Sequence, residues 1–203
     1  MKGSQYKLEA IGDIVRENLL VMQAILADHQ LLETVASIGE KMILALKDGK
    51  KLFFFGNGGS AADAQHLAAE FVGRFNRQRR ALPAIALTTD TSVLTSISND
   101  YSYESVFARQ LEGLGSPGDI AVGISTSGRS PNVLSGIRVA KDVGLIAVGM
   151  TGLSGKELLK LSDYCVRVPS DHAPRIQEAH ILIGHILCEM VDEGLAGSHG
   201  ELN

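Results

Sequence analysis

A histidine, a glutamate and an arginine interrupt the alanine-rich stretch AADAQHLAAEFVGRF at residues 61–75. His66, Glu70 and Arg74 recur every four residues, and this spacing predicts a single column of side chains along one face of a helix. Such a column is usually a solvated stripe whose ion pairs contribute about 0.2–0.5 kcal/mol each. These residue types also suit proton transfer or metal binding, because a carboxylate can act as a base and an imidazole as an acid, a base or a ligand.

A second set of polar side chains lies in the apolar helical stretch RIQEAHILIGHILCEMVDEGL at residues 175–195. Gln177 and His185 are eight residues apart, which is about 12 Å along an ideal helix. They can serve one compact site only if their side chains lean toward each other or if two copies of the chain contribute. His180 is rotated by about 140° from His185 around the helix, so we expect it to be structural.

Two loops rich in glycine and serine precede helical stretches. The first, GNGGSAADA at residues 56–64, has glycines that allow tight turns and close approach of backbone amides to a ligand, and Ser60 is predicted to cap the following helix. The second, STSGRSPN at residues 125–132, places Pro131 at the favoured first position of a helix. A helix N-terminus stabilises an anion by about 0.3–1 kcal/mol. Because both loops are predicted at one edge of one sheet, we expect them to bind a phosphate monoester.

Nucleotide-binding signatures are weak in these loops. A P-loop needs Gly-Lys followed by Ser or Thr, and neither loop contains it. The stretch from Gly56 to Ala61 does read as the G-x-G-x-x-A fingerprint of dinucleotide-binding folds. The acidic partner of that fingerprint is expected about 20 residues further on, whereas Asp90 lies 34 residues past Gly56. A dinucleotide would also leave the serine-rich loop unexplained.

Hydrophobic spacing predicts the elements that would position these groups. Apolar residues at three- and four-residue steps predict one helix over residues 8–26 and a second over 32–46, which Gly49 ends. Short apolar runs follow without polar alternation, which is typical of parallel strands covered by helices on both faces. The runs lie at residues 51–55, 84–87, 120–125, 145–150 and 164–168. They predict an α/β fold with a doubly wound five-stranded parallel sheet, whose ligands bind beyond the carboxyl ends of the strands.

The composition fits one folded domain over residues 1–203, with helices over 1–50 available for oligomer packing and a sheet-and-helix core over 51–195. The chain is 45% apolar and 21% charged, near the globular average, and its net charge of −4 argues against a nucleic-acid partner. No apolar run approaches the roughly 20 residues that span a bilayer, and the first residues lack a signal-peptide core. Cys165 and Cys188 have neither disulfide nor metal-ligand spacing. We therefore expect a cytoplasmic protein without a membrane partner.

A family resemblance connects these features. The chain closely resembles the phosphoheptose isomerases of the sugar isomerase (SIS) domain superfamily in the stretches GNGGSAADAQHLAAEFVGRF, LPAIALTTD, ISTSGRSPNV and RIQEAHILIGHILCEM. The resemblance implies an aldose-ketose isomerase that converts sedoheptulose 7-phosphate to D-glycero-D-manno-heptose 7-phosphate, a step toward the heptose of bacterial lipopolysaccharide. It also implies one zinc ion per subunit and a homotetramer with active sites at subunit interfaces, where the N-terminal helix would bury its apolar face.

The resemblance also implies a role for each matching residue. Glu70 would be the base that takes a proton from carbon, and His185 the acid that protonates oxygen, in an enediol mechanism. The zinc ligands would be His66, Glu70, Gln177 and His185. The phosphate would be held by Ser60, Ser125, Ser127 and Ser130 with the amides of Gly58 and Gly59, and the sugar would be contacted by Asn57, Glu70, Arg74, Asp100, Thr126 and Gln177.

Two points qualify the implied site. A residue cannot easily be a tight metal ligand and a free proton carrier at once, so substrate binding would loosen one ligand, or the metal would mainly organise the pocket. Pro174 also departs from the acidic residue that precedes RIQE in some relatives, so one minor substrate contact would be absent.

Two non-catalytic functions within the same superfamily remain as alternatives. One is a tetramer that binds the bacterial replication initiator protein, and the other is a sugar-phosphate sensor, a module normally attached to a DNA-binding domain. Members of the first kind lack the glutamate that Glu70 matches, so Glu70 favours the enzyme. Turnover of sedoheptulose 7-phosphate distinguishes the enzyme from both.

Overall fold

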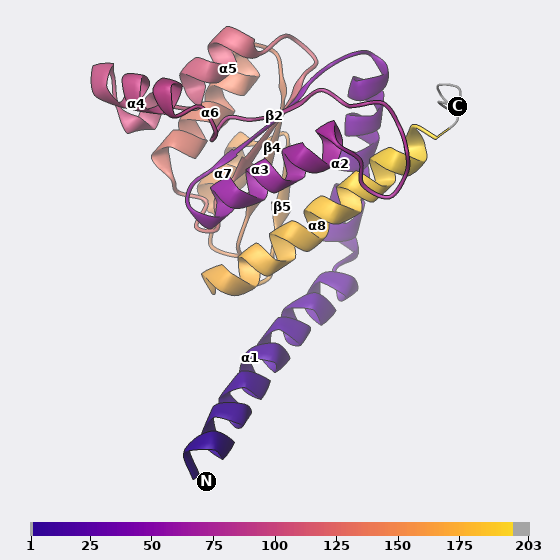
Figure 1. Ribbon diagram of the computed structural model, residues 1–203, viewed down its shortest axis with the longest axis vertical. Coiled ribbons are helices and arrows are strands. Elements are labelled where there is room, and N and C mark those ends of the chain that lie inside the picture. Colours follow the sequence, from indigo (N-terminus) through magenta and orange to yellow (C-terminus); the bar gives the residue numbers. More distant parts are fainter. Residues whose placement is uncertain (1, 197–203) are drawn as a thin grey trace.

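A single parallel sheet forms the centre of the molecule (Figure 1). The computed structural model describes residues 2–196, with side-chain surroundings from residue 7 onward. The strand order is β2-β1-β3-β4-β5. The strands are β1 Leu52–Gly56, β2 Ala84–Ala86, β3 Ile120–Ile124, β4 Ile146–Thr151 and β5 Tyr164–Arg167. All five predicted strands and the doubly wound arrangement are therefore confirmed.

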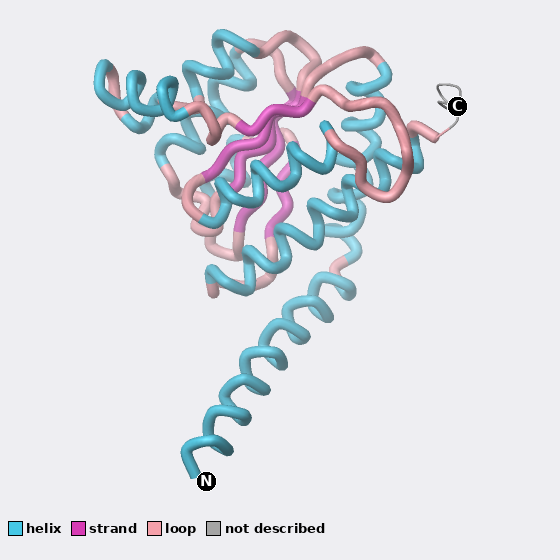
Figure 2. The backbone as a smooth tube through the Cα atoms, viewed as in Figure 1, coloured by secondary structure: helices cyan, strands magenta, loops and turns pink. Residues whose placement is uncertain are grey.

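Helices precede the sheet, connect its strands and close the chain (Figure 2). They are α1 Lys2–Ala27, α2 His29–Lys47, α3 Gly59–Val72, α4 Thr91–Asp100, α5 Ala108–Leu114, α6 Pro131–Asp142, α7 Lys156–Leu161 and α8 Ala173–Gly194, with a short 3-10 turn at Tyr103–Ser105. The two helices predicted before the first strand are confirmed as α1 and α2. Gly49 follows α2 with a φ of 72°, the left-handed conformation that glycine adopts at little cost.

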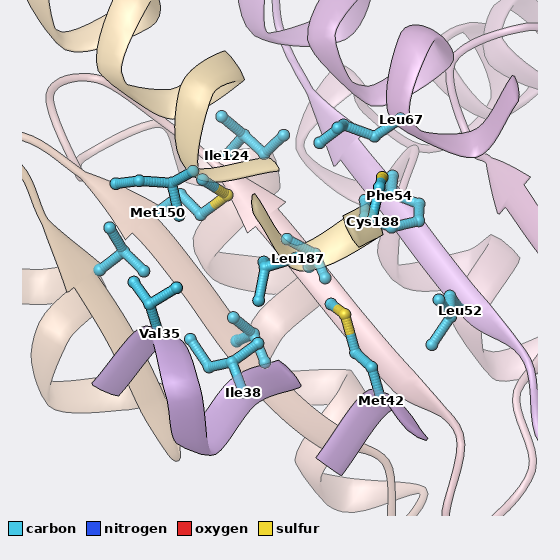
Figure 3. Close-up of a cluster of buried hydrophobic side chains, with 14 of the residues drawn as sticks. Val35, Ile38, Met42, Leu52, Phe54, Leu67, Ile124, Met150, Leu187 and Cys188 are labelled. Carbon is cyan, nitrogen blue, oxygen red and sulfur yellow. The ribbon is translucent and has the colours of Figure 1, made fainter. Parts of the chain in front are cut away.

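The two faces of the sheet bury alternate residues of each strand. Leu52 and Phe54 of β1 pack with α2, α3 and α8, whereas Phe53 and Phe55 pack with α5, α6 and α7. Figure 3 shows the first cluster, in which side chains of α2 and α8 meet those of the strands. Because both faces are covered, every position of β1 and β3 is buried, which explains apolar runs without polar alternation.

The chain reverses its direction across the sheet between β1 and β3. From β1 it moves outward to β2 and then returns to the other side of β1, where β3 pairs in parallel register with Gly56 opposite Ile124. The helices that follow β1 and β3 lie on opposite faces of the sheet. Sheets of this order bind ligands in the crevice beyond the carboxyl ends of two such strands, so we expect the ligand at the carboxyl ends of β1 and β3.

Helix α1 projects away from the body of the molecule (Figure 1). Several of its large apolar residues are exposed, namely Leu8, Ile11, Ile14, Val15, Leu19, Leu20 and Leu26. Near the middle of α1 the buried guanidinium of Arg175, in α8, donates to the carbonyl oxygen of Ile14 at 2.9 Å and to the carboxylate of Glu178 at 2.6 Å. The amide of Asn18 donates to the same carboxylate at 2.6 Å, so polar contacts join the middle of α1 to α8, in addition to the apolar packing of Val21 and Ile25.

Candidate functional site

The two glycine- and serine-rich loops meet at the crevice between β1 and β3. The hydroxyl oxygens of Ser125 and Ser130 are 2.9 Å apart, and both residues lie at the end of β3 or the start of α6. Ser60 is buried beside Gly56. A Cβ atom added at Gly56 would stand 2.8 Å from the Cβ of Ser60 and 2.7 Å from the carbonyl oxygen of Ile124. Only a glycine at position 56 lets Ser60 come this close to the end of β3.

The predicted capping role of Ser60 is wrong. Helix α3 begins at Gly59, so Ser60 lies inside its first turn, and Gly58 is the capping residue with a φ of 56° and no side-chain hydrogen bond. The first amides of α3 consequently have no side-chain acceptor at the cap, which suits an anionic ligand at this helix end. Pro131 does begin α6, as predicted, after Ser130.

A pair of asparagines joins the two loops, and only Asn57 was predicted as a site residue from the sequence. The amide nitrogen of Asn57 donates to Asn132 Oδ1 at 2.8 Å, and that of Asn132 donates to Asn57 Oδ1 at 2.9 Å. The hydroxyl of Tyr103 donates to the same oxygen of Asn57 at 3.1 Å. The polar residue after Ser-Pro was a weak signal for Asn132, but no sequence signal pointed to Tyr103.

The remaining residues predicted around the phosphate and the sugar have varied surroundings. The hydroxyl of Ser127 accepts from the amide of Arg129 at 3.3 Å, and the carbonyl oxygen of Thr126 accepts from the amide of Gly152 at 3.0 Å. Asp100 is exposed at the end of α4, where its carboxylate accepts from the side chain of Asn99 at 2.8 Å. No hydrogen bond among the described residues joins Asp100 to either loop.

A second group of polar side chains forms where α3 lies beside α8 (Figure 1). The Nε2 atoms of His66 and His185 are 2.8 Å apart, and His66 Nε2 is 3.4 Å from a carboxylate oxygen of Glu70. Two facing Nε2 atoms cannot both carry a proton at this distance, so at least one presents its lone pair to the other. The ring of Phe75 lies beside that of His185, with centroids 5.5 Å apart. The predicted convergence of Glu70 and His185 is therefore present within one chain.

The predicted column of His66, Glu70 and Arg74 is wrong at its last member. Helix α3 ends at Val72, so Arg74 follows the helix and is exposed. Glycine at position 73 ends the helical ladder, because glycine favours helix termination over continuation. Arg74 is thus in a loop and no longer shares a helical face with His66 and Glu70.

Gln177, the fourth predicted metal ligand, contacts the first residue of α3. Its side-chain amide packs directly against Gly59, so closely that a Cβ at Gly59 would overlap it. Gly59 is the first residue of α3, whereas Glu70 lies eleven residues further on, about 16 Å along the helix. Within one chain His66, Glu70 and His185 lie together, whereas the contact seen for the Gln177 side chain is with Gly59.

Two other titratable residues near these helices have shifted pKa values. Burial raises the pKa of Asp63 above its ordinary value, against the opposing charge of His66. One carboxylate oxygen of Asp63 is buried without a hydrogen-bond partner. Burial also lowers the pKa of His180 to about 4, although the contact with the carbonyl oxygen of Thr151 opposes this shift. His180 is fully buried, so its predicted structural role fits its position.

The three side chains near His185 offer atoms that suit a zinc ion. One atom each from His66, Glu70 and His185 lies within 4.8 Å of the others. In tetrahedral zinc sites, ligands at about 2.0–2.2 Å from the ion stand roughly 3.3–3.6 Å apart, and imidazole nitrogens with a carboxylate oxygen are common ligands. The observed separations of 2.8 and 3.4 Å are close to that spacing, so the donor set fits the metal.

The predicted site residues thus form two groups instead of one. Ser60 lies in the first turn of α3, beside the end of β3, and His66 and Glu70 lie further along the same helix, where they meet His185. Ser60 and Glu70 are ten residues apart, about 15 Å along α3. One chain holds the parts of an anion site and of an acid-base site, separated by most of the length of a helix.

Comparison with known proteins shows the family to which the chain is similar. Residues 20–152 match the family model described as SIS domain. The phosphoheptose isomerase of Aneurinibacillus thermoaerophilus is 51% identical over 181 residues, covering 89% of this chain and 91% of that protein. The phosphoheptose isomerase of Aquifex aeolicus is 51% identical over 186 residues, covering 92% of this chain and 96% of that protein.

Solved structures give the same result. The phosphoheptose isomerase from Neisseria gonorrhoeae is 39% identical with a TM-score of 0.85, and the match covers 91% of this chain and 98% of that chain. The phosphoheptose isomerase from Francisella tularensis is 35% identical with a TM-score of 0.88, and the match covers 92% of this chain and 98% of that chain. Both matches cover more than nine tenths of this chain and nearly all of the solved chain.

Proposed function

Because this chain belongs to the phosphoheptose isomerases of the SIS domain family, we propose that it converts sedoheptulose 7-phosphate to D-glycero-D-manno-heptose 7-phosphate. The chain is thus an aldose-ketose isomerase of heptose biosynthesis. The observation that carries the mechanism is that Glu70 and His185 both contact His66. The Nε2 atom of His66 is 3.4 Å from a carboxylate oxygen of Glu70 and 2.8 Å from Nε2 of His185. A carboxylate and an imidazole in one cluster supply the base and the acid that the reaction requires.

The proposed reaction moves one proton between neighbouring carbons through an enediol. Glu70 takes the proton from C1 of the ketose while His185 donates a proton to the carbonyl oxygen at C2. The C1 hydroxyl then gives its proton to His185, and Glu70 returns its proton to C2, which leaves an aldehyde at C1. Each residue ends the cycle in the protonation state in which it began it. Acid-base assistance of this kind accelerates a reaction by about 10²–10⁴-fold.

The phosphate would bind in the crevice between β1 and β3. Its oxygens would accept from the hydroxyls of Ser60, Ser125, Ser127 and Ser130 and from the amides of Gly58 and Gly59. The contact of Ser125 with Ser130 and the uncapped start of α3 support this assignment, since both leave donors for an anion. Asn57, Arg74, Asp100 and Thr126 would contact the sugar, with Asn57 held in place by Asn132.

One zinc ion per chain would be held by His66, Glu70 and His185, with Gln177 as a further ligand. The chemistry that a bound zinc ion supplies at such a site is polarisation of the sugar carbonyl. Gln177 would join either by a movement of its side chain or from a second copy of the chain. Equilibrium dialysis should find about one zinc ion per chain in the wild type and less in His66→Gln.

We also expect a homotetramer with active sites at subunit interfaces. The exposed apolar residues of α1 support an oligomer, because an apolar helix face is stable in water only when another surface covers it. The separation of the serine group from Glu70 within one chain supports a site that two subunits share. A cytoplasmic location likewise stays a prediction, supported by the free thiols of Cys165 and Cys188, since reducing compartments keep thiols unpaired.

Incubation with sedoheptulose 7-phosphate, followed by NMR spectroscopy of the sugar, tests the proposed function. The wild type should form the aldose phosphate. Glu70→Gln should lose about 10²–10⁴-fold in kcat and retain substrate binding measured by calorimetry. Binding of the substrate to the wild type without turnover would support a sugar-phosphate sensor instead. Turnover near the wild-type rate in Glu70→Gln would remove Glu70 from the role of base.

A further inference from the structure

A buried ion pair lies between the end of α8 and the loop after α3. A carboxylate oxygen of Asp192 accepts from the guanidinium Nε of Arg79 at 2.6 Å, and the side chain of Asp192 is 1% exposed. The other carboxylate oxygen accepts from the backbone amides of Asn76 and Arg77, at 2.9 and 3.0 Å. The mechanism above gives Asp192 no part, yet a buried carboxylate is costly unless it is fully paired.

The guanidinium of Arg79 also binds the last turn of α3. Its Nη2 donates to the carbonyl oxygen of Glu70 at 2.9 Å, and its Nη1 donates to that of Phe71 at 2.8 Å. Carbonyl groups at a helix end have no partner within the helix, so Arg79 satisfies them from outside. One planar guanidinium thereby connects the backbone of Glu70 in α3 to Asp192 in α8.

The same carboxylate holds the loop that carries Phe75. Asn76 and Arg77, whose amides donate to Asp192, directly follow Phe75 in the chain. The ring of Phe75 lies against the ring of His185, with centroids 5.5 Å apart. Figure 2 shows this loop beside the C-terminal part of α8. Asp192 is therefore linked by contacts to both members of the acid-base pair, to Glu70 through Arg79 and to His185 through the loop of Phe75.

The charge state of Asp192 fits this arrangement. Burial works to raise the pKa of Asp192, but the hydrogen bonds from Arg79 and from the amides of Arg77 and Asn76 outweigh it, so the pKa lies below its ordinary value. The carboxylate is consequently ionised at neutral pH, and its bonds to Arg79 are charge-assisted, which makes them stronger than neutral ones.

We propose that Asp192 and Arg79 are positioning residues that hold Glu70 and His185 at the separation needed for proton transfer. The proposal rests on the proposed isomerase function for its catalytic consequence. The guanidinium ties the end of α3 to α8, and the clamped loop keeps the ring of Phe75 against His185. Neither Asp192 nor Arg79 touches the reacting atoms, so both would act through the geometry of the two catalytic residues.

Asp192→Asn is the direct test. Asparagine keeps the size of the side chain but has only one oxygen, so it must give up either Arg79 or the two loop amides. We expect kcat to fall about 10- to 100-fold, the loss that a displacement near 1 Å causes, with KM changed by less than about threefold. The rates should be measured well below the melting temperature of each variant, so that unfolding does not contribute.

Asp119→Asn is the matched control. Asp119 is also fully buried, and its carboxylate accepts from two backbone amides, those of Lys51 and Ser116, and from the ammonium of Lys51. It precedes β3, at the amino end of the sheet and away from both groups of site residues. The control should lose stability, as we also expect for Asp192→Asn, but keep kcat within about twofold of the wild type.

Two further variants keep the proposal falsifiable if Asp192→Asn does not fold. Arg79→Lys retains the positive charge but cannot bind Asp192 and the carbonyl oxygens of Glu70 and Phe71 together, so kcat should again fall. Phe75→Leu leaves the ion pair intact and removes only the ring beside His185. We expect it to lower kcat about two- to tenfold, which corresponds to the energy of one aromatic pair.

The imidazole nitrogen resonances of His185, assigned with His185→Gln, give a readout that does not require turnover. Asp192→Asn should shift or broaden them, and Asp119→Asn should leave them unchanged. Wild-type kcat together with unchanged His185 resonances in Asp192→Asn, or equal losses of kcat in Asp192→Asn and Asp119→Asn, would overturn the positioning role. An inactive wild type would overturn the proposed function, and the resonances would then decide the positioning role alone.

Discussion

Replacement of Gly184 by alanine should separate the two helices that carry the acid-base group. Gly184 precedes His185 in α8 and faces Leu67, which follows His66 in α3. A Cβ at position 184 would stand 2.5, 2.9 and 3.2 Å from Cδ2, Cδ1 and Cγ of Leu67. Carbon atoms in contact are about 3.5–4.0 Å apart, so relief of the shortest of these contacts requires the helices to separate by roughly 1–1.5 Å unless Leu67 repacks.

The expected effect on stability is the balance of two terms. Forcing an extra methyl group into a packed core costs about 1–3 kcal/mol, and replacing glycine by alanine within a helix recovers about 1 kcal/mol. The free energy of unfolding should therefore fall by about 0–2 kcal/mol. For a chain of this size each kcal/mol lowers Tm by about 2–4 °C.

The expected effect on catalysis is larger than the effect on stability. The 2.8 Å contact between His66 and His185 joins the chain neighbours of Leu67 and Gly184 on the same two helices, and a displacement near 1 Å can cost about 100-fold in rate. We expect kcat of Gly184→Ala to fall about 10- to 100-fold. Turnover of sedoheptulose 7-phosphate and thermal unfolding, measured on the same preparation, give both quantities.

Gly113→Ala provides the control for Gly184→Ala. Gly113 lies in α5, and a Cβ there would meet no atom within 4 Å. Alanine at position 113 should stabilise the protein by about 0.4–1 kcal/mol and leave kcat unchanged. If Gly184→Ala also raised Tm and kept wild-type kcat, the packing of Leu67 on Gly184 could not be what sets the spacing of the two histidines.

Two further predictions concern the assembly and the acid stability. The first uses two inactive variants, Glu70→Gln and Ser125→Ala, whose chains are mixed after reversible dissociation. If active sites are shared between subunits, the mixture should recover about a quarter of wild-type turnover, because a quarter of the shared sites then receive both intact residues. No recovery would indicate sites within single chains. For His180, burial lowers the pKa from 6.5 to about 4, so the unfolded chain binds the proton more readily between these values. The free energy of unfolding is therefore unaffected by this group above pH 6.5. It falls as the pH drops from 6.5 toward 4, by up to about 1.4 kcal/mol per pH unit. Urea unfolding between pH 7.5 and 5 should show this slope in the wild type and a smaller one in His180→Gln, whereas equal slopes would contradict the assignment.

Local patterns were sufficient to predict the elements and their order. The run KLFFF at residues 51–55 predicted β1 because four of its side chains are apolar, and the structure buries them alternately on the two faces of the sheet. The periodicity of residues 32–46 predicted α2, and Gly49 ends it in a left-handed conformation. These features depend on neighbours within a few residues along the chain, which the sequence displays directly.

Element boundaries and caps were predicted less well. Ser60 was assigned to the cap of α3 and Arg74 to its last turn, but α3 begins at Gly59 and ends at Val72. Close packing of Ser60 against Gly56 and the end of β3 favours Ser60 inside the helix. At the other end, Arg79 binds the carbonyl oxygens of Glu70 and Phe71 from outside the helix. Both boundaries depend on contacts with other parts of the chain.

The sequence by itself determined the residue types of the site, the five strands and the helices on which most of these residues lie. Only the tertiary structure decided that His66 and Glu70 meet His185, that Asn57 pairs with Asn132, and that Gln177 contacts the far end of α3. The reason is physical: strand pairing and helix packing join residues more than a hundred positions apart, such as His66 and His185. Their distances depend on the shapes of the side chains between them, such as Gly184 against Leu67, and no local periodicity records those shapes.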